Sequence, residues 1–161
     1  MSNLEMKVDA LMRLVTASDS ETYDAALDHL IQLREQPKQD SQQVMSATEN
    51  MIEDILIKLG MPTNILGFNY TVEAIRLAAA DDQVAQDITG SLYPTVAKRY
   101  GTTPSRAERA IRHAIERAWS FCDLDTMFRF FGNAIDPGKG KPTNSQFITR
   151  IAKVLRRKMN E

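Results

Sequence analysis

The stretch PTVAKRYGTTPSRAERAIRHAIERAW, residues 94–119, decides how this chain folds. It predicts a short helix that contains Ala97, a turn at Gly101 four positions later, and a long second helix. Thr103 and Pro104 suit the start of that second helix, because threonine caps free backbone amides and proline at the first helical position needs no amide partner. This spacing is typical of a helix-turn-helix, in which the second helix enters the major groove of DNA.

The predicted second helix has an apolar face and a charged face. The apolar residues recur at helical spacing and are Ala107, Ala110, Ile111, Ala114, Ile115, Ala118 and Trp119. The residues of the charged face are Arg106, Arg109, His113, Glu116 and Arg117, with Arg112 on the flank. Arginine can donate two hydrogen bonds to guanine, and a glutamate such as Glu108 can accept one from cytosine. The alternative is a solvated helix with ion pairs between turns, but the position directly after the turn favours DNA reading.

Charge is distributed unevenly along the 161 residues, although the net charge is only −1. Residues 1–97 hold 6 Lys and Arg against 15 Asp and Glu, whereas residues 98–161 hold 14 against 6. A basic half is what binding to phosphates requires. The sequence therefore predicts double-stranded DNA as the partner of the C-terminal half.

Helical periodicity elsewhere predicts an all-α fold. Residues 1–36 are expected to form an N-terminal helical hairpin, for dimerisation or docking, because two helices bury too little surface to be stable alone. Its apolar, inward-facing residues are expected to be Leu4, Val8, Leu11, Met12, Val15, Tyr23, Ala26, Leu27, Leu30 and Ile31. The polar residues 37–45 predict a linker, and a new helix is expected near Ser46. Residues 46–161 then form the DNA-binding domain, with its last helix at 145–158.

Several function classes lack support in the sequence. The single cysteine, Cys122, excludes an intrachain disulfide, and no apolar run is long enough to span a membrane. His29 and His113 are the only histidines, and there is no phosphate loop, metal-spaced cluster or nucleophile elbow. We expect a cytoplasmic protein that is not an enzyme and that needs no cofactor and no metal.

Three stretches resemble a known family: MPTNILGFNYTVEAI, LYPTVAKRYGTTPSRAERAIRHAIERAW and KPTNSQFITRIAKVLR. They are similar to the C-terminal effector domain of the master sporulation response regulator of endospore-forming Firmicutes, from about Ser46 to Arg157. The resemblance implies an all-helical, six-helix-type DNA-binding module. It also implies regulation of transcription during sporulation, with tandem or homodimeric binding to short operator boxes.

The resemblance places the base-reading residues at Glu108, Arg109, Arg112 and His113. The candidates for contacts with the DNA backbone are Ser105, Arg106, Arg117, Lys139, Lys141, Lys153, Arg156 and Arg157. A lysine that the family uses against the backbone falls here on Val154. Thr143 and Asn144 are interpreted as the N-terminal cap of the last helix.

The chain departs from the family at its front. The family carries a phosphoacceptor receiver domain, and residues 1–45 are too short for one and lack buried-strand runs. We therefore expect no control by aspartyl phosphate within these residues. Two functions stay open: a sequence-specific transcriptional regulator, and an interaction modulator that associates with a full-length homologous regulator. The acidic hairpin could also shield the basic half.

Overall fold

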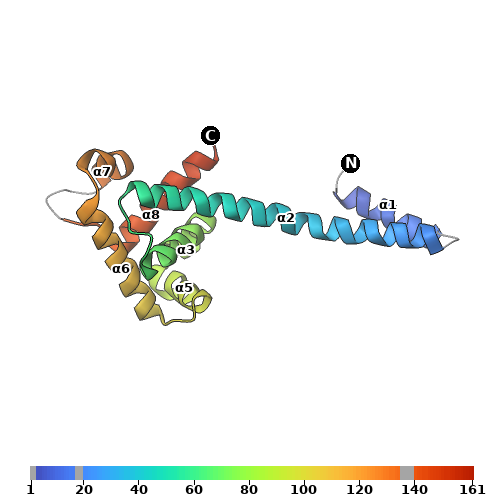
Figure 1. Ribbon diagram of the computed structural model, residues 1–161, viewed down its shortest axis with the longest axis horizontal. Helices are drawn as coiled ribbons and strands as arrows, with labels where there is room; N and C mark the ends of the chain where they lie inside the picture. The colour runs from blue at the N-terminus through green and yellow to red at the C-terminus, as the bar shows by residue number, and fades with distance from the viewer. Residues whose placement is uncertain (1–2, 17–19, 135–139) are drawn as a thin grey trace. The chain divides into compact units, whose positions relative to one another are not determined.

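All regular secondary structure in the described part of the chain is helical. A computed structural model describes the backbone of residues 3–16, 20–134 and 140–161, and the side chains of these ranges except 3–4 and 33–44. Within these ranges there is no β-strand, which confirms the predicted all-α fold (Figure 1). None of the helices described combines the length and the hydrophobicity that a membrane span requires. The chain divides into an N-terminal unit, Met1–Ala47, and a C-terminal unit, Thr48–Glu161.

Residues 37–45 are helical, so the prediction that a new helix begins near Ser46 is wrong. They lie inside α2, which runs without interruption from Ser20 to Lys58. Their polarity does not end the helix, because glutamine, lysine and methionine are good helix formers. Pro37 removes one backbone amide donor, which kinks or weakens a helix without necessarily ending it. The proposed roles of residues 1–36 and 46–161 stay predictions.

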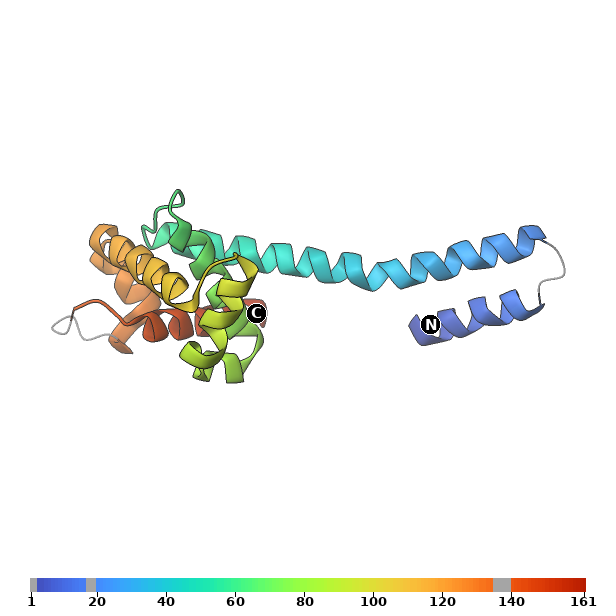
Figure 2. The ribbon, with the colours of Figure 1, turned by 90° about the horizontal axis from the view of Figure 1, so that it is seen from below.

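The N-terminal unit is an antiparallel pair made by α1 (Asn3–Thr16) and the first part of α2 (Figure 2). Among the side chains that the structure describes in this unit, the buried apolar ones are those of Ala10 and Ala26, which are 1% and 7% exposed. The predicted inner faces are therefore partly wrong. The large residues of the predicted faces that are exposed instead are Val8, Leu11, Met12, Val15, Tyr23, Leu27 and Ile31. The side chain of Leu4 lies outside the described side chains.

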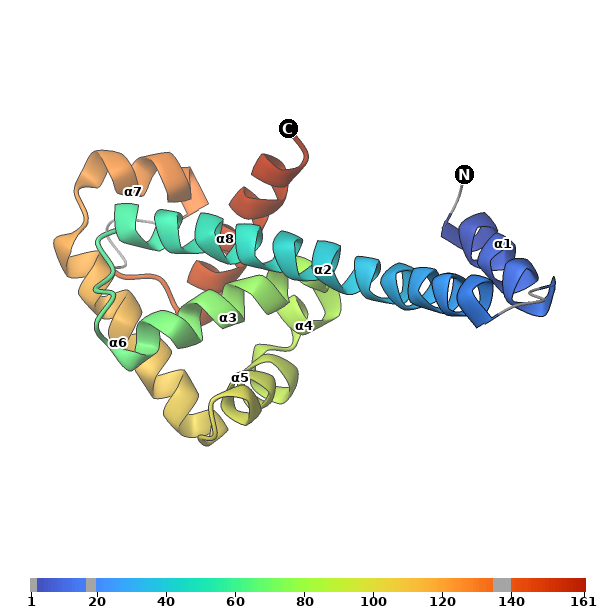
Figure 3. The same ribbon diagram turned by 45° about the vertical axis from the view of Figure 1, so that its right-hand side comes forward.

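The C-terminal unit begins with the end of α2 and contains the predicted helix-turn-helix. Its other helices, in chain order, are α3 (Leu66–Ala80), α4 (Asp82–Gln86), the single π-helical turn η1 (Ile88–Leu92), α5 (Tyr93–Arg99), α6 (Pro104–Phe121), α7 (Leu124–Phe131), the 3₁₀ turn η2 (Gly132–Ala134) and α8 (Asn144–Met159). Figure 3 shows α3, α6 and α8 close together in this unit. The last helix, α8, begins and ends within about one residue of the predicted bounds, 145–158.

The core of the C-terminal unit is built from large apolar side chains of several helices. Ile52 on α2, Ile75 on α3, Ile111 on α6 and Phe147 on α8 are all at most 1% exposed. The predicted apolar face of α6 is the face that is buried here. Burial of this kind fixes the rotation of α6 about its axis, so the opposite, charged face must point to solvent.

A close approach of α3 to α6 depends on Gly67. A Cβ atom on Gly67 would lie 2.1 Å from the carbonyl oxygen of Ala110 and 2.8 Å from the Cβ atom of Ala114. These separations are far below van der Waals contact, so any larger residue would force the two helices apart. The small residues Ala110 and Ala114 of α6 therefore allow α3 to pack closely against α6.

Candidate nucleic-acid interface

The turn between α5 and α6 has the local geometry that the sequence predicts. Gly101 has a φ angle of +63°, a conformation that glycine adopts at little cost. The Thr103 hydroxyl accepts a hydrogen bond from the Arg106 amide at 3.3 Å, and Pro104 is the first residue of α6. Because each of these features is local, the start of α6 is determined by the residues of the turn itself.

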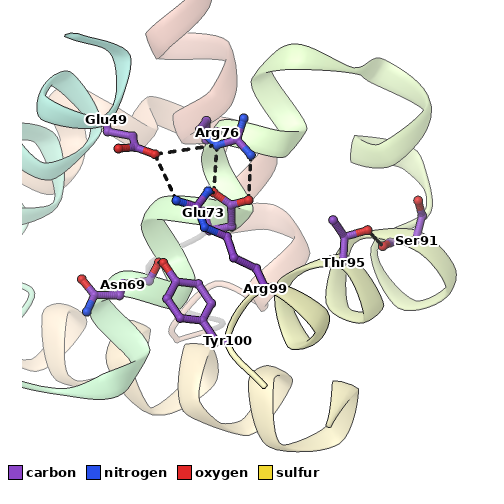
Figure 4. Close-up of polar contacts among 8 residues, drawn as sticks. All are labelled: Glu49, Asn69, Glu73, Arg76, Ser91, Thr95, Arg99 and Tyr100. Atoms are coloured by element: carbon purple, nitrogen blue, oxygen red, sulfur yellow. Dashed lines mark hydrogen bonds and ion pairs between the residues drawn. The ribbon is translucent and has the colours of Figure 1, made fainter. Parts of the chain in front are cut away.

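A buried carboxylate anchors α5, the first helix of the motif (Figure 4). Glu73 on α3 is 3% exposed and accepts hydrogen bonds from Arg76 at 2.8 and 2.7 Å and from Arg99 on α5 at 2.6 Å. Glu49 on α2 adds an ion pair with Arg99 at 3.6 Å. Burial raises the pKa of Glu73, but the hydrogen bonds from the two arginines outweigh burial and hold that pKa below its ordinary value of 4.5.

Tyr100, at the end of α5, adds a second anchor directly before the turn. Its ring packs on Tyr70 of α3 with 4.8 Å between centroids, and its hydroxyl donates to the carbonyl of Asn69 at 3.4 Å. The Arg99 guanidinium lies 5.8 Å from the centroid of the Tyr100 ring. These contacts join α5 to α3 at the point where the chain turns into α6, so the turn starts from a fixed position.

The charged face of α6 is open to solvent. Its exposed residues are Ser105, Arg106, Arg109, Arg112, His113 and Arg117, while Glu108 is half-buried. The four predicted base-reading residues therefore lie on one helix, within two turns of each other. Four of the predicted backbone contacts lie elsewhere on the described surface, so α6 carries the compact part of the predicted site.

The predicted base-reading residues differ in how they are held. Arg112 forms an ion pair with Glu108 one turn earlier, an arrangement that the solvated-helix alternative also predicts. Arg109, in contrast, makes no hydrogen bond or ion pair with any residue that the structure describes. Arg117 lies over the ring of Phe121 at 5.2 Å. Arg109 can thus reach a base without breaking a contact. Arg112 would either break its ion pair with Glu108 or approach the DNA with that ion pair intact.

The start of α8 is attached to both helices of the motif. Thr143 caps α8 in a capping box with Gln146, as the sequence predicts for this position. Asn144 is not part of the cap: it is 9% exposed and donates to the hydroxyl of Tyr93 at 3.0 Å and to the carbonyl of Glu108 at 3.1 Å. Burial raises the pKa of Tyr93 above its ordinary value of 10.0. Asn144 therefore holds α5, α6 and α8 together.

An open hollow lies where these three elements meet. It has a volume of about 630 Å³. Its lining residues include Asp87, Glu108, Arg112, Lys141, Thr143 and Ser145. Lys141 also forms an ion pair with Glu116, and its hydrogen bond lowers the pKa of that carboxyl. The hollow places both acidic and basic groups, with hydroxyl groups, directly beside the exposed face of α6.

Arg156, predicted to contact the DNA backbone, has another role in the structure. Its guanidinium donates to the carbonyls of Ala78 at 2.6 Å and Ala79 at 2.9 Å, and forms an ion pair with Asp82. These carbonyls lie in the last turn of α3, where carbonyl groups receive no hydrogen bond from the amides of the helix itself. Arg156 on α8 therefore caps the C-terminal end of α3, and this contact explains an arginine at this position without any contact with DNA.

The remaining predicted backbone contacts are spread over the surface. Lys153 and Arg157 are exposed on α8, and Val154 beside them is partly buried. Lys139 lies outside the described residues. Thus the structure gathers Ser105, Arg106 and Arg117 with the base-reading set on α6, and leaves Lys153 and Arg157 on a separate helix.

Sequence reasoning missed the anchoring contacts of Glu73, and it interpreted Asn144 as part of the cap of α8, whereas the structure gives it contacts with Tyr93 and Glu108. Glu73 meets Arg99 26 residues away along the chain, and Asn144 meets Tyr93 51 residues away. Glu73 carries a sequence signal, because it is an acidic residue in an otherwise apolar helix with Arg76 three positions later. Asn144 carries none, since an asparagine next to a cap is ordinary.

The fold and this surface define a helix-turn-helix DNA-binding domain. The family model described as sporulation initiation factor Spo0A C terminal matches residues 52–155 of this chain. The match covers more than half of the sequence, and the chain belongs to this family. The family is one of DNA-binding effector domains of sporulation regulators and is not an enzyme family. This finding confirms the family that the three resembling stretches indicate.

Proposed function

We propose that this chain regulates transcription by reading a specific DNA sequence with α6. In this proposal α6 lies in the major groove, Arg109 and Arg112 donate to guanines, Glu108 accepts from cytosine, and His113 contacts a neighbouring base. The base-reading set lies on the face of α6 that core packing turns outward. Catalysis, a cofactor and control by aspartyl phosphate are not part of this function.

The observation that carries the proposal is the open side chain of Arg109 on a firmly anchored helix. On a solvated helix, Arg112 and Glu108 are explained by the ion pair that they form between neighbouring turns. Arg109 forms no such ion pair with the described residues, so this explanation does not extend to it. The anchors at Glu73 and Asn144 hold the motif in place before DNA arrives. Such preorganisation lowers the loss of conformational entropy that accompanies binding.

The same geometry divides the phosphate contacts into two groups. Ser105 and Arg106 lie at the start of α6, where the positive end of the helix and the Arg106 charge favour an anion. Arg117, Lys139, Lys141, Lys153 and Arg157 would supply sequence-independent attraction. We leave Arg156 out of this group, because its guanidinium caps α3.

Selection from a randomised duplex library tests sequence reading directly. We expect the wild-type chain to enrich a short box and to bind it more tightly than random DNA. Arg109→Ala should lose about 1–3 kcal/mol for that box, roughly five- to 150-fold, and should relax specificity at one position. Arg129→Ala on α7 removes an exposed arginine of the same charge away from the motif and is the matched control.

Two outcomes would contradict sequence reading. If no box is enriched at any salt concentration, specific recognition is absent. If Arg109→Ala and Arg129→Ala weaken binding equally, the loss is one of general charge. Binding to a full-length homologous regulator in the absence of any enriched box would favour the alternative function, an interaction modulator. Tandem or homodimeric occupancy is read from the spacing of enriched half-sites.

A further inference from the structure

The two sides of the N-terminal helix pair differ in chemistry. One side is a small recess lined by the alanines Ala10, Ala25 and Ala26 together with Arg13, Thr22 and His29. Asp9 pairs with Arg13 at 3.0 Å beside it. The large apolar residues of the unit are absent from this recess, so their position relative to it decides whether they form one surface.

Helix geometry places Leu11 and Leu27 on the side opposite the recess. Leu11 follows buried Ala10 by one residue and Leu27 follows buried Ala26 by one residue, so each lies about 100° around its helix from the contact line. Because the helices are antiparallel, the same step turns both side chains to the same side. Ala25 precedes Ala26 by one residue and lies in the recess, which agrees with this assignment.

Further exposed apolar residues extend this side along α2 and onto the outer face of α1. On α1 its residues fall within a sector of about 100°, and on α2 they recur every fourth residue. We call these residues the apolar strip: Val8, Leu11, Met12, Val15, Tyr23, Leu27 and Ile31, which are between 40% and 84% exposed. An exposed apolar surface of this extent marks an interaction site in a soluble protein.

The area of the apolar strip matches what a dimer needs. Its side chains leave on the order of 700 Å² open, close to the roughly 800 Å² that each partner contributes to a standard interface. Two helices bury too little surface to be stable alone, whereas four helices around a shared apolar centre form a stable bundle. A second copy supplies the missing pair without any further partner.

We propose that the apolar strip is a self-association surface through which two copies of this chain form a four-helix bundle. Residues 1–47 carry 8 acidic and 4 basic side chains, so charge opposes the association and apolar burial drives it. Salt screens the repulsion and should strengthen the dimer. The same salt weakens contacts with DNA phosphates, so the two properties respond in opposite directions.

One consequence rests on the proposed function. A helix-turn-helix reads one half-site, and a dimer brings a second reading helix to the same DNA at a high effective concentration. The self-association itself needs no DNA. Its failure in solution is therefore distinguishable from a failure of sequence reading, which selection of DNA boxes tests separately.

Sedimentation equilibrium of the full chain without DNA measures the proposed dimer. We expect a dimer at micromolar concentration whose dissociation constant decreases several-fold from low to high salt. The double variant Leu11→Glu and Leu27→Glu should be monomeric under the same conditions. Ala25→Glu is the matched control for the charge that Leu27→Glu adds, because it puts one carboxylate two residues away on the opposite side of α2, and it should remain dimeric.

Crosslinking keeps the test valid if the double variant loses its helical structure. In a Cys122→Ser background, Leu27→Cys should be joined between copies by a short bis-maleimide, and Ala25→Cys should not. A monomeric wild type, a dimer that weakens with salt, or equal dissociation by Ala25→Glu would each overturn the proposal. So would association only with a full-length homologue or only with the basic half of the same chain.

Discussion

Val15 in the N-terminal unit is 84% exposed, whereas Ile111 in the C-terminal unit is 0% exposed, although each lies on an apolar stripe of a helix. The difference comes from the number of neighbours. In the C-terminal unit, α6 is enclosed by other helices that cover most of its apolar face. In the N-terminal unit, α1 has one neighbour, and two helices meet along a single line where only small residues are enclosed.

Polar groups show the same contrast between the two units. Glu73 in the C-terminal unit is 3% exposed and its carboxylate is fully engaged by Arg76 and Arg99. Asp9 and Arg13 in the N-terminal unit form an ion pair whose side chains are 54% and 69% exposed. The helical spacing of residues in the sequence therefore does not predict how much of each side chain is buried. The strength of a polar contact depends on that burial.

Removing buried volume should give the largest difference between the units. Ile111→Ala is expected to lower the free energy of unfolding of the C-terminal unit by about 2–5 kcal/mol, because it creates a cavity. Val15→Ala should leave that transition within about 0.5 kcal/mol of wild type. Trp119 is the single tryptophan of the chain and lies in the C-terminal unit, so urea unfolding followed by its fluorescence measures this unit. Equal losses would contradict the contrast.

The approach of α3 to α6 can be tested by adding one methyl group. Gly67→Ala should destabilise the C-terminal unit by about 1–3 kcal/mol, because its Cβ atom would overlap the backbone of α6. An ordinary glycine inside a helix gives the opposite sign, since alanine is preferred there by roughly 0.5–1 kcal/mol. Thermal unfolding decides between the two, and a stabilised variant would show that the helices are not in close contact.

Acid should weaken the C-terminal unit through Glu73. Its folded pKa lies below the ordinary value of 4.5, so the stability it contributes is present above pH 4.5 and is lost as the pH falls toward the folded pKa. Glu73→Gln should cost about 1–2 kcal/mol at neutral pH and flatten the acid dependence. Glu53→Gln, on the same unit, is the control. Urea midpoints between neutral and acidic pH make the comparison.

The smallest effect is expected from the exposed ion pair of α1. Arg13→Ala should change the helicity of the N-terminal unit little, because exposed pairs contribute about 0–0.5 kcal/mol. It also leaves the apolar strip intact, so the sedimentation behaviour should match that of wild type. Circular dichroism and sedimentation on one sample check both properties. A large loss of helicity would show that polar contacts, rather than apolar ones, hold the pair together.

The parts that could be predicted are those with local causes. Gly101, Thr103 and Pro104 act within a few residues of the turn, and the spacing of the apolar residues on α6 predicts which face is buried. The same local reasoning failed at residues 37–45, because polarity by itself does not end a helix. It also misjudged Val8 and Leu11, since an apolar stripe indicates a face to be covered without indicating what covers it.

The amino-acid sequence by itself therefore determined the helices, the caps, the turn and the row of residues on α6, because propensity, capping and periodicity act over one or two turns. Only the tertiary structure decided that Glu73 fixes Arg99, that Asn144 joins three helices and that Arg156 caps α3. These contacts connect residues 26 to 78 positions apart. Their geometry exists only after the core has packed, because the core sets which distant backbone groups come within hydrogen-bonding distance.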